Sequence, residues 1–236
     1  MEDGESVPVP LAVRTSDLKV RALSAVVMLA VAGGALWLGE WWWTTFVIAV
    51  SLVVAWEWFG LTRRFSLPSV WFAIWLLLGV VYIFAAGWTL NSLRQEAPMA
   101  VLLILGAVVA TDVGAYFAGR TIGGPKIAPS ISPSKTWAGL FGGAIASTVF
   151  LACVAYAGLR NVDYGPMVLG MALLAGPTIA IVAQAGDFFE SWMKRRAGVK
   201  DSGNLIPGHG GVFDRTDGLL AVAAFGYPVL QLLLAV

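Results

Sequence analysis

Residues 70–90 read VWFAIWLLLGVVYIFAAGWTL, a run without a single charged side chain. Because an α-helix rises about 1.5 Å per residue, this run is long enough to cross the hydrocarbon layer of a bilayer, which is roughly 30 Å thick. Similar apolar stretches lie on both sides of it along the chain. We expect about seven membrane-spanning helices, at residues 22–39, 42–60, 70–90, 97–118, 137–158, 166–186 and 218–236.

The composition agrees with a polytopic membrane protein. Hydrophobic residues make up 58% of the chain and charged residues 12%, with 27 Gly and 11 Trp. Such a composition suits a transmembrane helical bundle better than a soluble core. No polar stretch is long enough to fold alone. We therefore expect an all-α bundle that forms a single membrane domain over residues 1–236, with N-terminal spans in 1–100 and a second half, 101–236, that carries nearly all the polar groups not explained by interfacial anchoring.

The basic residues predict the orientation of the bundle. If the N-terminus is cytoplasmic, only Arg94 and Arg160 fall on the outside. The other basic residues then lie inside: Arg14, Lys19, Arg21, Arg63, Arg64, Arg120, Lys126, Lys135, Lys194, Arg195, Arg196, Lys200 and Arg215. This bias follows the positive-inside rule and places the N-terminus inside and the C-terminus outside. The acidic start is unlike a signal peptide, so the first span is expected to be retained.

Other residue types narrow the possible functions. The basic residues are spread over several loops and the net charge is +1, so a nucleic-acid partner is not expected. Cys153 and His209 are the only residues of their kinds, which excludes a disulfide framework and a His/Cys zinc site. No P-loop and no G-x-G-x-x-G occurs. Tryptophans near span ends are expected to anchor the bundle at the membrane interface: Trp41, Trp42, Trp43, Trp56 and Trp58.

Residues 187–217 read DFFESWMKRRAGVKDSGNLIPGHGGVFDRTD and gather charge, Gly and Pro between two apolar segments. Charge beside a bilayer is costly unless it has a function, so this block is the candidate active site. If the sixth span continues past Gly186, helical spacing predicts one polar stripe. The stripe would consist of Asp187, Glu190, Ser191 and Lys194, with Arg195 beside it.

A glycine-rich loop follows this stripe. Pro207 and the glycines around His209 predict a backbone that approaches a ligand closely, and His209 is either a ligand contact or a structural histidine. Asp214 and Asp217 open the last span on one face, where aspartate is also an ordinary helix cap. Asp187 and Asp214 flank the loop and are candidate ligands for one or two hard cations such as Mg²⁺. Carboxylates among many basic groups, without a nucleophile–base pair, indicate phosphoryl-type transfer.

Two segments before the block also carry polar groups. In the fourth span, Asp112, Tyr116 and Arg120 share one helix face, which indicates either a site or an internal ion pair of Asp112 with Arg120. In the following loop, Ser132 before a proline predicts a helix N-cap. Lys135 and Thr136 would then lie in the first turn, either as a phosphate site or as ordinary capping and topology.

The motifs S-x-M-K-R-x-x-x-x-K-D (191–201) and I-P-x-H-G-G-V-x-D-R-T-D (206–217) together resemble the signature of the phosphatidate cytidylyltransferase, or CDP-diacylglycerol synthase, family. The segments D-x-G-A-Y-F-A-G-R (112–120) and S-P-x-K-T-W-x-G (132–139) also resemble this family, so the similarity covers about residues 102–236. The family often reads S-P-K-K-T-W-E-G at the latter segment, whereas this chain has Ser134 and Ala138.

The resemblance implies that CTP and phosphatidic acid react to give CDP-diacylglycerol and pyrophosphate, with Mg²⁺, alone or with a second cation, on Asp187 and Asp214. It implies catalytic roles for Asp187, Asp214, Lys194 and Arg195. Substrate contacts are implied for Asp112, Tyr116, Arg120, Ser132, Lys135, Thr136, Ser191, Lys200, Asp201, His209, Gly210, Gly211, Arg215 and Asp217. It also implies a bacterial inner-membrane protein among membrane lipids, an active site on the cytoplasmic face, and a homodimer.

Two other functions remain open from the residues alone. A CTP-dependent polyprenol or phytol kinase would phosphorylate an alcohol and would need a general base. A transporter would use Asp112 and Asp187 as an ion path, although no inverted repeat is evident and the charges gather in one region. Glu57, within the second span, is expected to make a hydrogen bond inside the bundle, with a contribution to the site as the alternative.

Overall fold

The computed structural model describes residues 11–158 and 165–228. The described chain is helical almost throughout. Its α-helices are α1 (Leu11–Leu38), α2 (Glu40–Arg63), α3 (Ser69–Glu96), α4 (Pro98–Thr121), α5 (Trp137–Gly158), α6 (Gly165–Arg196) and α7 (Phe213–Ala221), and a π-helical segment, Val222–Gly226, continues α7. Six of these helices, α1 to α6, are long and apolar enough to cross a membrane. The expected all-α, polytopic bundle is confirmed, and the protein is an integral membrane protein.

Helix ends differ from the predicted spans where polar residues continue a helix. The span predicted at 166–186 belongs to α6, which runs on to Arg196. Hydropathy marks only the lipid-facing part of such a helix, whereas backbone hydrogen bonds continue past it. The span predicted at 218–236 begins earlier, at Phe213, and its residues 229–236 lie outside the described part of the chain.

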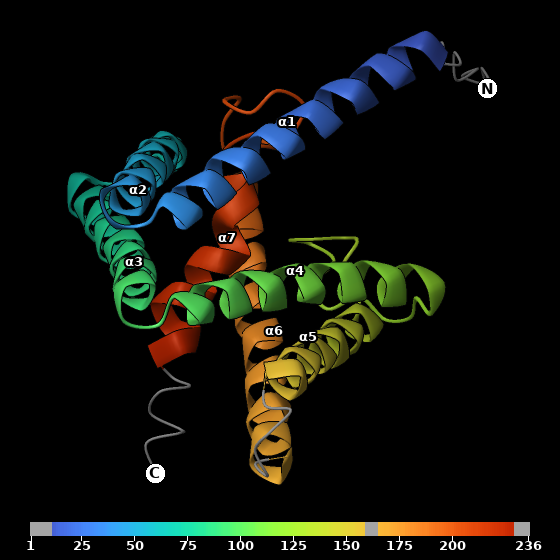
Figure 1. The fold of residues 1–236 in the computed structure, drawn as a ribbon. Coiled ribbons are helices and arrows are strands. Elements are labelled where there is room, and N and C mark those ends of the chain that lie inside the picture. Colours follow the sequence, from blue (N-terminus) through green and yellow to red (C-terminus); the bar gives the residue numbers. More distant parts are fainter. Residues whose placement is uncertain (1–10, 159–164, 229–236) are drawn as a thin grey trace, which may run out of the picture.

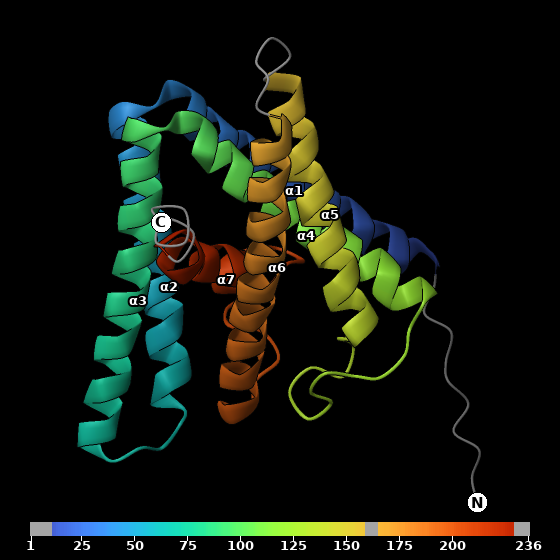
Figure 2. The same cartoon turned by 90° about the horizontal axis from the view of Figure 1, so that it is seen from below.

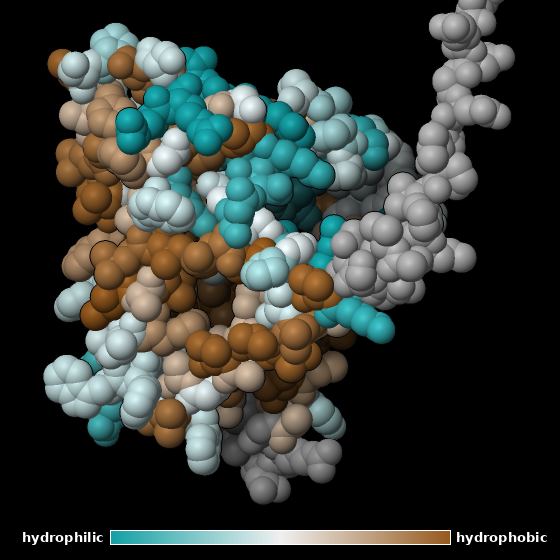
Figure 3. Space-filling view, turned by 90° about the horizontal axis from the view of Figure 1, so that it is seen from above, coloured by the Kyte–Doolittle hydropathy of each residue, from teal (hydrophilic) through white to brown (hydrophobic). Residues whose placement is uncertain are grey.

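The helices form two groups with α7 between them. Figures 1 and 2 show α2 and α3 side by side, and α5 beside α6 on the other side of the molecule. The residues of α7 and its π-helical continuation are mostly buried, with Phe213 and Val222 fully covered. Many large apolar side chains on the outer surface are exposed, as expected for the lipid-facing residues of a membrane bundle. Figure 3 shows broad hydrophobic areas on one face of the molecule.

An aromatic cluster joins the two groups. The Trp58 ring of α2 lies 5.7 Å from the ring of Phe189 in α6 and 5.8 Å from that of Phe213 in α7. Its indole N–H donates to the carbonyl of Trp75 in α3 over 3.0 Å. Interfacial anchoring, predicted for Trp58, is therefore wrong. Trp58 is only 3% exposed, and it can be buried because its indole N–H has a hydrogen-bond partner inside the bundle. Trp43 is likewise buried, whereas Trp41, Trp42 and Trp56 are exposed.

Glycines bring α4 and α5 into close contact. A Cβ atom built on Gly114 would lie 2.5 Å from the Cβ of Ala146 and 2.6 Å from the carbonyl oxygen of Gly142. Gly142 and Gly143 face α4 in the same way. Small residues at such positions let two membrane helices approach backbone to backbone. This packing positions the end of α4 beside the loop that precedes α5.

Candidate active site

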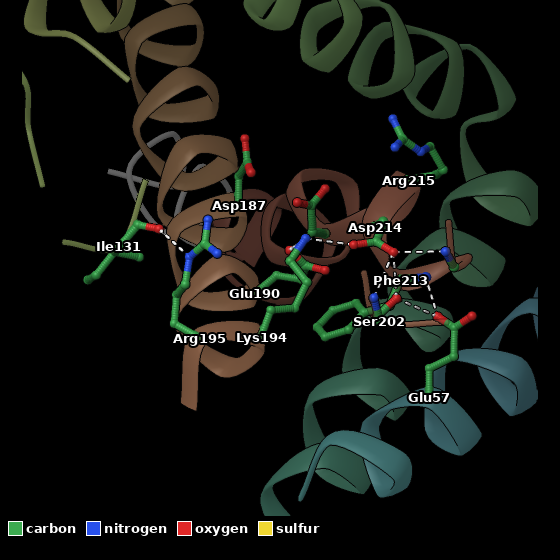
Figure 4. A network of polar contacts seen from close by, with 12 residues as sticks. Glu57, Ile131, Asp187, Glu190, Lys194, Arg195, Ser202, Phe213, Asp214 and Arg215 are labelled. Atoms are coloured by element: carbon green, nitrogen blue, oxygen red, sulfur yellow. Dashed lines mark hydrogen bonds and ion pairs between the residues drawn. The ribbon is translucent and has the colours of Figure 1, made fainter. Parts of the chain in front are cut away.

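The polar stripe predicted on the sixth helix is present, because α6 continues past Gly186 in helical geometry. The Lys194 ammonium group lies between two carboxylates. Its Nζ is 2.6 Å from Oε2 of Glu190 and 2.6 Å from Oδ1 of Asp214 (Figure 4). Glu190 is only 1% exposed. The extension of α6 and the start of α7 therefore meet in a buried cluster of charges.

Asp214 is held by donors on both of its oxygens. Besides Lys194 at Oδ1, Oδ2 accepts the backbone N–H groups of Ser202 (2.9 Å) and Gly211 (2.8 Å). The Ser202 hydroxyl lies 2.9 Å from the same oxygen. Burial opposes the charge, but hydrogen bonds from Glu190, Lys194 and the two backbone N–H groups outweigh it and lower the pKa of Asp214 to about 2. Asp214 is therefore ionised at neutral pH.

Asp187 lies one helical turn before Glu190 and is paired with Lys135, from the loop between α4 and α5. The Lys135 ammonium group also lies 5.2 Å from the ring centroid of Phe188. Burial lowers the pKa of Lys135, while the charges of nearby carboxylates oppose that shift. Asp187 and Asp214 thus face different lysines, and Asp187 takes no part in the hydrogen-bond chain around Asp214 in Figure 4.

The helix start predicted at Ser132 is wrong. Helix α5 begins at Trp137, and Thr136 caps it, because its Oγ1 accepts the backbone N–H of Gly139 over 3.0 Å. The preceding segment folds back on itself instead, with a hydrogen bond of 3.1 Å from Ile127 N to the Lys135 carbonyl. Ser132 is buried within this loop. Lys135 is therefore directed to Asp187 by a loop rather than by a first helical turn.

A cavity of about 480 Å³ lies between α4, this loop and α6. It brings together several residues that the sequence placed in separate motifs. Its lining includes Asp112, Tyr116, Arg120, Lys135, Thr136 and Asp187. The predicted shared face of α4 is confirmed, but Arg120 donates to the Tyr116 hydroxyl over 2.8 Å, and the alternative ion pair of Asp112 with Arg120 is absent from the described side chains.

A larger cavity, of about 1020 Å³, lies between α2 and residues 199–205. Lys200 and Asp201, from the predicted site, line it together with residues of α2. From the sequence, Arg63 and Arg64 were predicted only to set the orientation of the bundle in the membrane, yet both line this cavity. Their position directly after an apolar span was the only signal in the sequence.

The glycine-rich loop has the backbone conformation that its composition predicted. Gly208 and Gly210 adopt φ angles of 74° and 81°, which glycine tolerates without a steric penalty. The His209 carbonyl accepts the Nε of Arg215 over 2.9 Å, and the buried His209 Nδ1 has no hydrogen-bond partner. Arg215 therefore stabilises the loop, and in Figure 4 it lies away from the Lys194 cluster.

The remaining predicted residues lie around these cavities. Ser191 is half-buried on α6, and Arg195 donates to the Ile131 carbonyl over 3.4 Å, linking α6 to the loop before α5. Burial raises the pKa of Asp217 to about 6, against the hydrogen bond from Gly218 N and the charges of Lys135 and Lys194. Among residues 11–158 and 165–228, no three His, Cys, Asp or Glu side chains are close enough to form a metal site by themselves.

Comparison with known proteins identifies the class of enzyme to which this arrangement belongs. The cytidylyltransferase family matches residues 19–93 and 62–233, and the chain belongs to that family. A phosphatidate cytidylyltransferase of Brucella suis is 34% identical over 90% of this chain and 93% of its own length. One from Pseudomonas aeruginosa is 38% identical over 85% of this chain and 72% of its own length.

A phosphatidate cytidylyltransferase of Rickettsia bellii is 31% identical over 88% of each chain. The resemblance predicted from the motifs is therefore confirmed, and it covers the N-terminal spans as well as the catalytic half. The chain is an enzyme of the nucleotidyltransferase class.

Proposed function

We propose that this protein transfers CMP from CTP to phosphatidic acid and so makes CDP-diacylglycerol and pyrophosphate. The observation that carries the proposal is similarity, over nearly the whole chain, to enzymes named phosphatidate cytidylyltransferase. The site supports it through its chemistry. Ionised carboxylates and ammonium groups lie together where α6 and α7 meet, as a reaction between two phosphate compounds requires.

In the proposed reaction, an oxygen of the lipid phosphate attacks the α-phosphorus of CTP. A new P–O bond forms as the bond to the bridging oxygen of the β-phosphate breaks, and pyrophosphate leaves with that electron pair. Phosphatidate is already ionised at neutral pH, so the attacking oxygen needs no general base. The work of the protein is therefore to hold the two phosphates in line and to offset their charge.

Asp187 and Asp214 are the residues proposed to hold Mg²⁺, alone or with a second cation. The donors fit such an ion by type, because Mg²⁺ prefers carboxylate oxygens, but both carboxylates are paired here, so a bound ion would take the place of the ammonium groups of Lys135 and Lys194. Mg²⁺ is commonly held by one or two carboxylates together with water and substrate phosphates. When bound, it would neutralise the charge of the triphosphate and of the leaving group.

The basic residues of the site are proposed to bind the phosphates. Lys135 and Arg120 line the smaller cavity, and Lys200 lines the larger one. The Gly-rich loop around His209 is proposed to pack against the nucleotide. The proposal includes a homodimer, a catalytic half in residues 101–236, and a site on the cytoplasmic face, where CTP meets a lipid phosphate at headgroup level.

The test is to incubate the purified full chain in detergent with phosphatidic acid, radiolabelled CTP and Mg²⁺. We expect a lipid product whose mass corresponds to addition of CMP. Asp187→Asn and Asp214→Asn should abolish it, whereas Glu40→Gln, an exposed acid at the far end of α2, should not. A phosphorylated alcohol in place of CDP-diacylglycerol would identify a lipid kinase, and ion flux without CTP turnover would identify a transporter.

A further inference from the structure

Glu57 is a buried acid that neither the motifs nor the proposed mechanism uses. It lies on α2, in the N-terminal half, and only 2% of it is exposed. No Lys, Arg or His side chain pairs with it in the part of the chain that the structure describes. A buried carboxylate without a cationic partner is costly unless hydrogen bonds satisfy it. The groups that satisfy Glu57 therefore indicate why an acid stands there.

Those groups belong to the start of α7. Oε1 of Glu57 accepts the backbone N–H of Val212 over 2.9 Å, and Oε2 accepts that of Phe213 over 2.7 Å. Val212 is the N-cap of α7, and no side chain of its own segment caps the helix. The first N–H groups of a helix lack intrahelical acceptors and carry partial positive charge. Glu57 therefore caps α7 from a different helix, as Figure 4 shows.

Two glycines make room for this carboxylate. A Cβ atom on Gly203 would lie 2.5 Å from Oε1 of Glu57 and 3.0 Å from its Cδ, with no other residue among its nearest atoms. A Cβ atom on Gly211 would lie 2.6 Å from each carboxylate oxygen. Neither glycine has a left-handed backbone, so space rather than φ requires glycine there. The glycines of this loop thus serve close contact with α2.

The same carboxylate is linked to Asp214. The Ser202 hydroxyl lies 3.0 Å from Oε2 of Glu57 and 2.9 Å from Oδ2 of Asp214, so it bridges the two acids and donates to one at a time. Gly211, which approaches Glu57, also donates its N–H to Asp214. Every group that orients Oδ2 of Asp214 therefore lies on the segment that Glu57 anchors.

We infer that Glu57 is a positioning residue of the active site: it anchors the Ser202–Phe213 segment to α2 and thereby sets the position of the Asp214 carboxylate. The inference rests on the proposed function for its activity readout. It also means that residues 1–100 contribute to the site, although the motifs lie in 101–236. Glu57 contacts backbone and Ser202 rather than the reacting atoms, so its effect is transmitted through Asp214.

The first test compares Glu57→Gln with Glu40→Gln, the same change on an exposed acid of α2. Glutamine keeps the size of Glu57 but presents one acceptor oxygen and an NH₂ group to donors that need two acceptors. We expect kcat to fall about 10–100-fold, with a higher Mg²⁺ concentration at half-maximal activity, as happens when a support of a metal ligand is lost. Glu40→Gln should match the wild type. A purely structural role would lower the yield of folded protein but leave both parameters unchanged.

The second test does not depend on the folding of Glu57→Gln. Gly203→Ala introduces a methyl group whose three nearest atoms all belong to Glu57, whereas Gly170→Ala on α6 meets nothing within 4 Å. We expect Gly203→Ala to lower kcat about tenfold in the wild type but to have little further effect in a Glu57→Ala background, a coupling usual for contacting residues. Gly170→Ala should be neutral in both.

The outcomes separate the two proposals. If the wild type makes no CDP-diacylglycerol, the proposed function fails. If the wild type is active and Glu57→Gln keeps its kcat and Mg²⁺ dependence, the positioning role is wrong. Independent, multiplying losses from Gly203→Ala and Glu57→Ala would also overturn it, because the alanine methyl group would then act elsewhere than on Glu57.

Discussion

Replacing Lys194 by methionine is expected to destabilise the folded protein strongly, because its ammonium group is the cation between two buried acids. Nζ lies 2.6 Å from Glu190 and 2.6 Å from Asp214, and these side chains are 1% and 4% exposed. Methionine keeps most of the packing but removes the charge, so the buried Asp214 carboxylate would lose its cationic partner. Removing one partner of a buried ion pair costs about 3–5 kcal/mol.

Thermal unfolding of the purified chain in detergent measures this cost. At roughly 2–4 °C per kcal/mol for a chain of this length, the melting temperature should fall by about 6–20 °C. Arg196→Met is the matched control, because Arg196 is an exposed cation at the same end of α6. A Lys194→Met protein that melts within about 2 °C of the control would refute the reasoning.

Three other substitutions test the packing and the smaller cavity. Gly142→Ala should lower the melting temperature, by overpacking worth about 1–3 kcal/mol against Ala118 on α4, whereas Gly170→Ala, in open space, should not. Trp58→Ala should cost about 3–5 kcal/mol in unfolding experiments and Trp56→Ala much less, because Trp58 is 3% exposed and Trp56 64%. Lys135→Met should reduce CDP-diacylglycerol synthesis at least tenfold by removing the cation beside Asp187, with the fold unchanged by circular dichroism; wild-type turnover would contradict its role.

The helical fold could be predicted from the chain because hydropathy is a local property. Six of the seven predicted spans, residues 70–90 among them, appear as helices of sufficient length, whereas the last, 218–236, continues into residues 229–236, outside the described part of the chain. Helix caps were harder to predict than the spans. The span predicted at 137–158 matches α5, but the cap predicted at Ser132 is wrong, because Thr136 caps the helix and the fold of the preceding loop decides that. Trp58 and Trp56 are alike in sequence, yet only one faces the bundle.

Much of the candidate site could also be located in advance, because its residues cluster in a few motifs. The stripe from Asp187 to Lys194 follows from helical spacing alone, and α6 presents it as expected. The partners of those residues did not follow from spacing. The family resemblance implies a catalytic role for Lys194 and a substrate contact for Arg215, but it does not indicate that Lys194 bonds to Glu190 and Asp214 or that Arg215 bonds to the loop at His209.

Residues close together along the chain are enough to identify a membrane bundle, the position of its charged block and the family signature that the block carries. The contacts of Glu57, in contrast, follow from the packing of the folded helices. It accepts hydrogen bonds from Val212 and Phe213, more than 150 positions away. The donors are backbone N–H groups, which the residue type does not reveal. A contact of that kind arises only when α2 and α7 pack together.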